Sequence, residues 1–366
     1  MINNNSHPDE YLERQYLVSS FDVAERIEAL LEAAVPPNSP NAQLYREMML
    51  TVARMTESDR SRWDAKIMMQ TLREMEASFD LLDRFKRRRK VTVFGSARTE
   101  PDHPLYQQAK ELGEILARHN LMVITGAGGG IMAAAHEGAG PDSSLGLNIV
   151  LPFEQGANAT MQERNSHLLT FHFFFLRKLF FVKEADALVL CPGGFGTLDE
   201  AWEVLTLVQT GKSPLVPIVL LDVEGGTYWD KCLEFMQEEM VDKGYILPED
   251  MGLIRLVRTP QEAGLEIARF YANYHSTRWY RDSFVIRTNH RLTEEALDYL
   301  NANFSDICLS GKIRQVHYCE ETHREPEFCN LHRLEFAFNA RDLGRLRQLV
   351  DYINLPENWA TTEAFR

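Results

Sequence analysis

The chain has 366 residues and a net charge of −14, with 45% hydrophobic and 25% charged residues, a composition typical of globular proteins. The acidic balance disfavours proteins that coat nucleic acid or anionic membranes, and no apolar run approaches the roughly 18 to 20 residues of a membrane helix. The N-terminus lacks the pattern of a signal peptide, and five cysteines fit free thiols in a reducing compartment. We therefore expect a cytoplasmic protein of one to three domains that binds neither nucleic acid nor membrane.

The N-terminal part of the chain, residues 1–87, is predicted to be a helical extension. Apolar residues recur three to five apart over 59–85, which indicates an amphipathic helix. Prolines within 36–40 separate two shorter helices before it. The basic run KRRRK at 86–90 then leads into a strand. A solvated linker is the simpler interpretation of this run, and a patch for nucleic acid or phosphate is the alternative.

Residues 88–275 alternate short apolar strands with helical stretches. Near-continuous apolar runs are typical of strands buried on both faces of a parallel sheet. The alternation predicts an α/β domain with a doubly wound, mostly parallel, Rossmann-like sheet. The expected strands are 91–94, 121–125, 147–151, 187–191 and 215–221, and the expected helices include 105–119, 198–209 and 260–274.

Residues 276–366 are predicted to form a small α+β domain, with strands at 284–288, 313–318 and 331–338 and helices at 293–304 and 342–353. Two cysteines and two histidines lie close together in this part of the sequence. Their spacing matches no common zinc pattern, so we assign no metal to Cys319, His323, Cys329 and His332.

Two glycine-rich turns follow predicted strands directly. The first glycine-rich turn is residues 125–130 and the second is residues 191–197. Ligands of open parallel sheets lie beyond the carboxyl ends of the strands, where a helix N-terminus and a glycine-rich backbone bind phosphate. The first turn is no dinucleotide fingerprint, because Ile131 replaces its third glycine. Either turn alone is also compatible with a purely structural tight turn.

The second glycine-rich turn carries ionisable residues. Thr197 and Glu200 have the spacing of a capping box, in which Glu200 satisfies only a backbone donor. However, two carboxylates, Asp199 and Glu200, at an anion-binding helix end repel the ligand unless one has another task or a cation neutralises it. Arg177, with Lys178 beside it, is the candidate cation.

The segment RKLFFVKEADALVLCPGGFGTLDE, together with VFGSAR, ITGAGGGIMAAAHEGA and LNIVLPFEQG, resembles the Lonely-guy family over roughly residues 88–274. These proteins are cytokinin-activating phosphoribohydrolases that are often labelled lysine decarboxylases. Arg177 and Glu200 stand 23 positions apart, as in the family. The resemblance implies a modified Rossmann fold, a homodimer or higher homo-oligomer, and no metal or other cofactor. It also implies hydrolysis of the N-glycosidic bond of a nucleoside 5′-monophosphate such as AMP or a cytokinin nucleotide, releasing free base and ribose 5-phosphate.

By position, the resemblance makes Arg177 and Glu200 the catalytic pair. A carboxylate suits this chemistry, because cleavage of a glycosidic C–N bond builds positive charge on the anomeric carbon. Arg177 is expected to keep that carboxylate ionised. Glu154 is matched to a ribose-contacting glutamate. The remaining expected contacts to substrate or phosphate are Lys178, Gly193, Gly194, Phe195, Gly196, Thr197, Leu198, Asp199, Thr206, Gly95, Ser96, Gly128 and Gly129.

The sequence departs from the plant-type pattern at Phe174 and Phe175, where a Met-His pair is expected. Core packing is the simpler explanation, and a reshaped base pocket is the alternative. Either explanation leaves the preferred base open. A non-catalytic carrier or sensor of nucleotides or phosphorylated cofactors is the rival function. The intact pair of Arg177 and Glu200 favours the enzyme, because a binder needs no carboxylate beside its phosphate.

Overall fold

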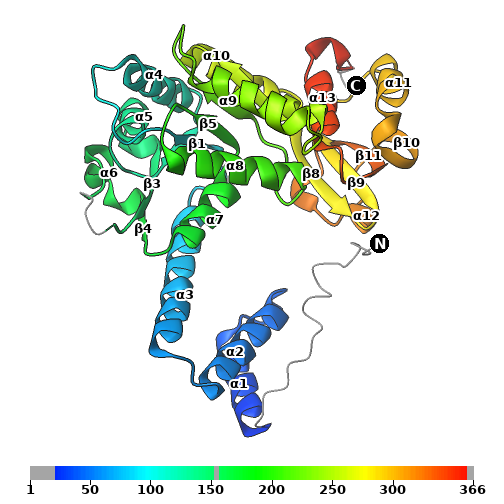
Figure 1. Ribbon diagram of the computed structural model, residues 1–366. Helices are drawn as coiled ribbons and strands as arrows, with labels where there is room; N and C mark the ends of the chain where they lie inside the picture. The colour runs from blue at the N-terminus through cyan, green and yellow to red at the C-terminus, as the bar shows by residue number, and fades with distance from the viewer. Residues whose placement is uncertain (1–20, 152–155, 361–366) are drawn as a thin grey trace. The chain divides into compact units, whose positions relative to one another are not determined.

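The computed structural model describes residues 21–151 and 156–360, and the chain divides into two compact units after Arg73. The first unit contains α1 (Phe21–Ala34), α2 (Ala42–Glu57) and the start of α3 (Arg62–Asp83), which continues into the second unit (Figure 1). The helical character expected of residues 1–87 is therefore confirmed for the described part, and residues 1–20 lie outside the described residues. The domain boundaries expected after residues 87 and 275 stay predictions.

A seven-stranded parallel sheet in the order β4-β3-β2-β1-β5-β6-β7 dominates the second unit, which confirms the predicted α/β class. Sequence analysis missed its two edge strands, β4 and β7. Both are only partly buried, so they lack the continuous apolar runs that mark the inner strands. The strands are β1 (Lys90–Phe94), β2 (Met122–Thr125), β3 (Ser144–Ile149), β4 (Leu168–Phe171), β5 (Ala187–Leu190), β6 (Ile218–Leu221) and β7 (Ile254–Val257).

Helices cover both faces of this sheet (Figure 1). One face packs on α4 (Pro104–Arg118), α5 (Ile131–Ala139) and α10 (Pro260–Phe270). The other packs on α7 (Phe174–Glu184), α8 (Phe195–Gln209) and α9 (Tyr228–Met236). Alternate side chains of each inner strand enter the two cores, because successive residues of a strand point to opposite faces.

The C-terminal part of the second unit is an antiparallel sheet in the order β10-β11-β9-β8, as the α+β prediction requires. The helix expected over 260–274 ends at Phe270 instead. Asn354 Oδ1 accepts hydrogen bonds from the backbone amides of Asn273 (2.9 Å) and Tyr274 (2.7 Å), and Tyr274 opens a strand. The C-terminal elements are β8 (Tyr274–Tyr280), β9 (Ser283–Thr288), β10 (Cys308–Val316), β11 (His332–Phe338), α11 (Glu294–Asn303), α12 (Glu320–His323) and α13 (Leu343–Ile353). The short helix α6 (Ala159–Glu163) lies between β3 and β4 of the parallel sheet.

Two negative findings apply to the described residues. Within 21–151 and 156–360, no group of three or more His, Cys, Asp or Glu side chains is placed to hold a metal ion. No helix in these ranges combines the length and the apolar character that crossing a lipid bilayer requires. His323 Nδ1 accepts a hydrogen bond from the backbone amide of Cys319 at 2.9 Å, so this pair fixes a local backbone turn.

Candidate active site

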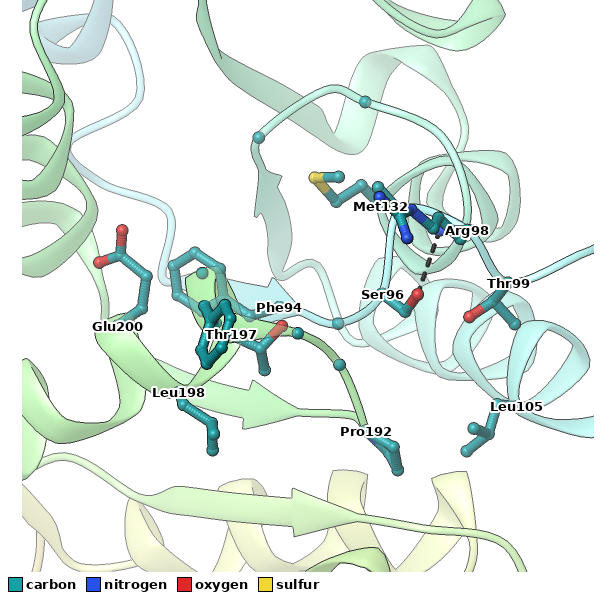
Figure 2. Close-up of a pocket in the computed structure, with 18 of the residues that line it drawn as sticks. Phe94, Ser96, Arg98, Thr99, Leu105, Met132, Pro192, Thr197, Leu198 and Glu200 are labelled. Atoms are coloured by element: carbon teal, nitrogen blue, oxygen red, sulfur yellow. Dashed lines mark hydrogen bonds between the residues drawn. The ribbon is translucent and has the colours of Figure 1, made fainter.

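A large cavity lies where the strand order of the parallel sheet reverses. The chain proceeds outward from β1 through β2 to β4, and then from β5 to β7 on the other side. Ligands of doubly wound sheets bind at such a switch point. The loops after β1 and β5 line a cavity of 1380 Å³ there (Figure 2). The two loops are joined by a hydrogen bond from the Ser96 amide to the Pro192 carbonyl at 3.1 Å.

The second glycine-rich turn opens into this cavity. Gly194 is the N-cap of α8 and provides no side-chain cap. Within the described part of the chain, the amides of Phe195 and Gly196 have no hydrogen-bond acceptor. A Cβ atom added at Gly194 or Gly196 would meet nothing within 4 Å, so packing does not require either glycine. The turn therefore presents unpaired helix N–H groups to an open space, which is the arrangement that binds anions.

The capping box expected from Thr197 and Glu200 is wrong. The helix begins at Phe195, three residues earlier than the predicted helix, and Thr197 is its third residue. Glu200 consequently lies in the second helical turn and is 4% exposed. Its Oε2 atom is buried and has no hydrogen-bond partner among residues 21–151 and 156–360. A capping function does not explain this carboxylate.

Burial dominates the electrostatics of Glu200. Desolvation raises the pKa of its carboxyl group to about 7, although the charges of Lys178 and Arg177 lower it. The nearby carboxylates of Glu203 and Asp199 raise it further. We expected Arg177 to keep Glu200 ionised, but desolvation outweighs that effect. Protonated and ionised forms therefore coexist near neutral pH, a property typical of catalytic carboxyl groups.

Lys178 of α7 makes two ion pairs with carboxylates of α8. Its Nζ lies 2.7 Å from Asp199 Oδ2 and 2.9 Å from Glu203 Oε2. Burial lowers the pKa of Lys178, but the hydrogen bonds to these two carboxylates produce a net increase. Lys178 therefore neutralises Asp199, which would otherwise repel an anion at the helix N-terminus.

Arg177 connects the first glycine-rich turn to the same cavity. A Cβ atom added at Gly126 would lie 3.6 Å from Arg177 Nη1. The guanidinium Cζ lies 5.0 Å from the ring centre of Phe174, which also lines the cavity. Core packing does not explain the aromatic pair, because Phe174 and Phe175 are 50% and 57% exposed. Phe174 is instead available to contact a planar base.

The first glycine-rich turn is tightly packed. Gly130 has φ +58°, and a Cβ atom there would lie 2.2 Å from the Ser96 carbonyl oxygen. At Gly126 and Gly128, a Cβ atom would contact the end of the Met132 side chain at 2.9 and 2.8 Å. The neighbouring backbone and Met132 therefore fill the space that a side chain would need.

His136 follows this turn at the sixth position of α5, the position that Glu200 holds in α8. Nε2 lies 3.2 Å from the Leu145 carbonyl oxygen, and Nδ1 lies 3.2 Å from Asn158 Nδ2. Burial lowers the pKa of His136 to about 4. Its ring is thus neutral at physiological pH and has a partner for each nitrogen, as expected of a structural histidine.

Comparison with known proteins identifies the family. The family model described as "Possible lysine decarboxylase" matches residues 129–267. The probable cytokinin riboside 5′-monophosphate phosphoribohydrolase LOGL2 of Oryza sativa subsp. japonica is 31% identical over 181 residues, which are 48% of this chain and 70% of that protein. The chain belongs to the Lonely-guy family.

Another Lonely-guy protein, the cytokinin riboside 5′-monophosphate phosphoribohydrolase LOG7 of Arabidopsis thaliana, is 32% identical over 171 residues, or 45% of this chain and 73% of that protein. Among solved structures, the molybdenum cofactor binding protein from Rippkaea orientalis is 17% identical. That match covers 49% of this chain and 94% of the other, with a TM-score of 0.35.

The cavity brings together most of the residues expected from the Lonely-guy resemblance. Four of them, Lys178, Asp199, Gly129 and Thr206, do not line it. Thr206 Oγ1 donates to the Trp202 carbonyl at 2.7 Å within α8, and Glu154 lies outside the described residues. The expected residues that line the cavity are Gly95, Ser96, Gly128, Arg177, Gly193, Gly194, Phe195, Gly196, Thr197, Leu198 and Glu200.

Sequence reasoning missed several residues of the cavity wall. Arg98 follows β1 and lies opposite Glu200 in the view of Figure 2. Its backbone amide donates to Ser96 Oγ at 3.1 Å. Tyr228, at the start of α9, donates its hydroxyl to the Gly193 carbonyl at 2.8 Å. Both follow carboxyl ends of parallel strands, so the strand pattern contained a signal for them that we did not use.

Proposed function

We propose that this protein hydrolyses the N-glycosidic bond of a nucleoside 5′-monophosphate, releasing free base and ribose 5-phosphate. The observation that carries the proposal is Glu200, a buried carboxyl group whose Oε2 has no partner among the described residues, in the wall of a large cavity. Such a group is unfavourable for stability. It is accounted for if its partner is the substrate.

The uncapped end of α8 supports phosphate binding. The amides of Phe195 and Gly196 would donate to the 5′-phosphate, and the helix dipole favours the negative charge. Glu200 is five residues further along the same helix, or about 7.5 Å along its axis. This separation is of the order of the length of a ribose phosphate, so one rigid helix would hold the phosphate and present a carboxylate to the anomeric carbon.

Ionised Glu200 would act on the sugar. As the C–N bond breaks, the base leaves with the bonding electron pair and positive charge develops on C1′, which the carboxylate stabilises. A water molecule adds to C1′ and passes a proton to Glu200, and this proton then passes through solvent to the departing base, which is released in its neutral form and leaves Glu200 ionised again. Arg177 favours the ionised form of Glu200 by lowering its pKa. Phosphate binding away from the reacting bond orients the sugar for this step.

The proposal includes a homo-oligomer, as the family resemblance implies. Phe195 is 94% exposed beside the cavity, and Leu179 of α7 is 46% exposed. A second copy covering these apolar groups would also close the cavity mouth against water. Size-exclusion chromatography with light scattering tests this part, because a Leu179→Asp variant is expected to shift the protein toward monomer.

Chromatographic detection of products tests the activity. The protein is incubated with a panel of nucleoside 5′-monophosphates, and free base and ribose 5-phosphate are quantified. Equimolar release from at least one substrate is expected, together with no release from the corresponding nucleoside, which lacks the phosphate. Nucleotide binding without release of base would instead support the carrier or sensor function.

A further inference from the structure

A second cavity lies at the end of the parallel sheet that is opposite to the candidate active site. It has a volume of 320 Å³ and is lined by residues next to the amino ends of β1 and β5, whereas the candidate active site lies at the carboxyl ends. Its walls include the basic segment that leads into β1, the C-terminal end of α7, residues 214–216 before β6, and Tyr271 with the first residues of β8 in the C-terminal sheet. Its size falls at the lower end of the range of small-molecule sites.

Positive charge dominates this cavity. Lys86, Arg89, Lys90 and Lys183 line it, against two carboxylates, Glu184 and Asp186, among the described lining residues. Three of these cations belong to the run KRRRK: Lys86 is exposed, as a solvated linker predicts, whereas Arg89 is partly buried and Lys90 is buried in β1. This concentration of positive charge occurs in a chain with a net charge of −14.

The two carboxylates are already engaged. Glu184 pairs with both Lys90 Nζ (3.1 Å) and Lys183 Nζ (2.5 Å). Asp186 Oδ2 accepts the Lys90 backbone amide at 2.9 Å, and its Oδ1 lies 4.0 Å from Arg89 Nη1. Lys86 pairs with Asp83, which does not line the cavity. Four cations are thus paired with three carboxylates, and Glu184 is shared by two lysines, so one positive charge of the lining is not balanced.

The strand β8 contributes neutral polar groups to the opposite wall. Ser276 Oγ accepts a hydrogen bond from Arg287 Nη1 at 2.9 Å and lies 2.8 Å from His275 Nδ1. Arg287 is 5% exposed, so its orientation is fixed by its surroundings. Burial, followed by the positive charges of Arg89 and Arg287, lowers the pKa of His275. The guanidinium of Arg89 stacks on the Tyr271 ring, with Cζ 3.5 Å from the ring centre. The cavity thus contains this guanidinium together with lysines and hydroxyl groups.

We propose that this second cavity binds the phosphate or diphosphate group of a small metabolite. Arg89 and Lys183 face the ligand as cations, and the hydroxyl groups of Ser276 and Thr277 complete the donor set. Strand β8 of the C-terminal sheet forms part of the cavity wall, and the volume of 320 Å³ suits a compact ligand. Lys183 lies on α7, the helix that also carries Arg177, so the ligand contacts an element of the candidate active site. The proposal does not depend on the activity proposed above.

Calorimetric titration of the full chain with inorganic pyrophosphate tests the proposal. The parent protein for the test is Gly196→Asp, in which the added carboxylate repels anions from the N-terminus of α8. Gly196 has open space around it, so this variant is expected to fold. One pyrophosphate per chain is expected to bind in this parent, and adding Arg89→Ala with Lys183→Ala is expected to weaken binding roughly tenfold or more.

Two further variants provide a control outside the cavity and a second test of Lys183. Lys110→Ala with Arg118→Ala removes two cations that lie outside the cavity, and it is expected to leave pyrophosphate affinity unchanged. Lys183→Glu reverses a charge on a half-exposed side chain without disturbing the Arg89–Tyr271 contact, and it is expected to weaken binding in a fully folded protein. The proposal is overturned if the Gly196→Asp parent binds no pyrophosphate, or if both changes at Lys183 leave affinity unaltered.

Discussion

The two glycine-rich turns have the same place in the architecture but different surroundings. Each links an inner parallel strand to a helix, and each helix carries a buried ionisable residue at its sixth position, His136 or Glu200. Backbone and Met132 surround the glycines of the first turn, whereas Gly194 and Gly196 have open space. Both His136 nitrogens have partners, whereas Glu200 Oε2 has none among the described residues.

This difference separates a structural glycine-rich turn from a ligand-binding one. In the first turn, Gly130 is required because it has φ +58° and a side chain there would collide with the backbone of Ser96 and Ala97. In the second, a side chain at Gly193 would collide with Thr197, but nothing among the described residues requires Gly194 or Gly196, so their lack of a side chain serves the approach of another molecule. The following predictions test this contrast, from the largest expected effect to the smallest.

Replacing Glu200 with Gln is expected to reduce kcat about a thousandfold, because the amide cannot stabilise positive charge on C1′ or accept a proton. The product assay described above measures this loss. A His136→Asn variant provides a comparison, since its effect is expected on stability rather than on the chemical step. A Glu200→Gln protein with unaltered kcat would contradict the mechanism.

The same Glu200→Gln variant is expected to be more stable than the native protein at pH 8. Because the folded-state pKa is raised from 4.5 to about 7, the native carboxyl group is favourable for folding below pH 4.5 and becomes unfavourable as pH rises through 7. Removing the buried charge should therefore stabilise by up to about 3 kcal/mol at pH 8. Thermal denaturation at pH 5 and pH 8 measures the difference, which should be small at pH 5.

Gly130→Ala is expected to destabilise the protein by about 3 kcal/mol, since the residue has φ +58° and an added Cβ would lie 2.2 Å from the Ser96 carbonyl oxygen. Gly196→Ala is the matched control in the second turn. With nothing within 4 Å of its Cβ, it should leave stability unchanged or raise it slightly. Urea denaturation compares the stabilities of the two variants. Equal losses of stability would contradict the proposed difference between the two turns.

Gly196→Asp is expected to raise KM roughly tenfold to a hundredfold. Its carboxylate would occupy the anion-binding end of α8, where it is favourable to the helix but repels a phosphate. Steady-state kinetics should therefore show weakened substrate binding in a protein whose melting temperature is unchanged or higher. A KM equal to that of the native protein would mean that the phosphate binds elsewhere.

Of these changes, Lys178→Met is expected to have the smallest effect, which is a shift in the pH dependence of kcat/KM. Since ionised Glu200 is the active form, kcat/KM should rise with pH along a limb with an apparent pKa of about 7. Lys178 lowers the pKa of Glu200, so its removal should move this limb to higher pH. Lys110→Met, at an ion pair elsewhere on the surface, should leave the profile in place.

The sequence by itself determined the class of the fold and the two turns. Apolar runs predicted the inner strands, because these are buried on both faces, and missed the edge strands β4 and β7, which are not. The PGGFGTLDE segment and the Arg177–Glu200 spacing likewise identified the family, since a glycine-rich segment and a fixed spacing along the chain can be read from the sequence directly. The run KRRRK was also evident in the sequence. The sequence did not show that Lys86, Arg89 and Lys90 line a cavity.

Only the tertiary structure decided which turn is open and what each ionisable group does. The helix after the second turn begins at Phe195 rather than after a Thr197 cap, so Glu200 lies in a buried helical turn. Lys178, and not Arg177, makes the ion pair that neutralises Asp199. These outcomes depend on desolvation and on neighbours that are distant in sequence, such as Ser96, whose carbonyl oxygen lies against Gly130 of the first turn. Burial and charge are properties of the assembled surroundings, and no local pattern of residues contains them.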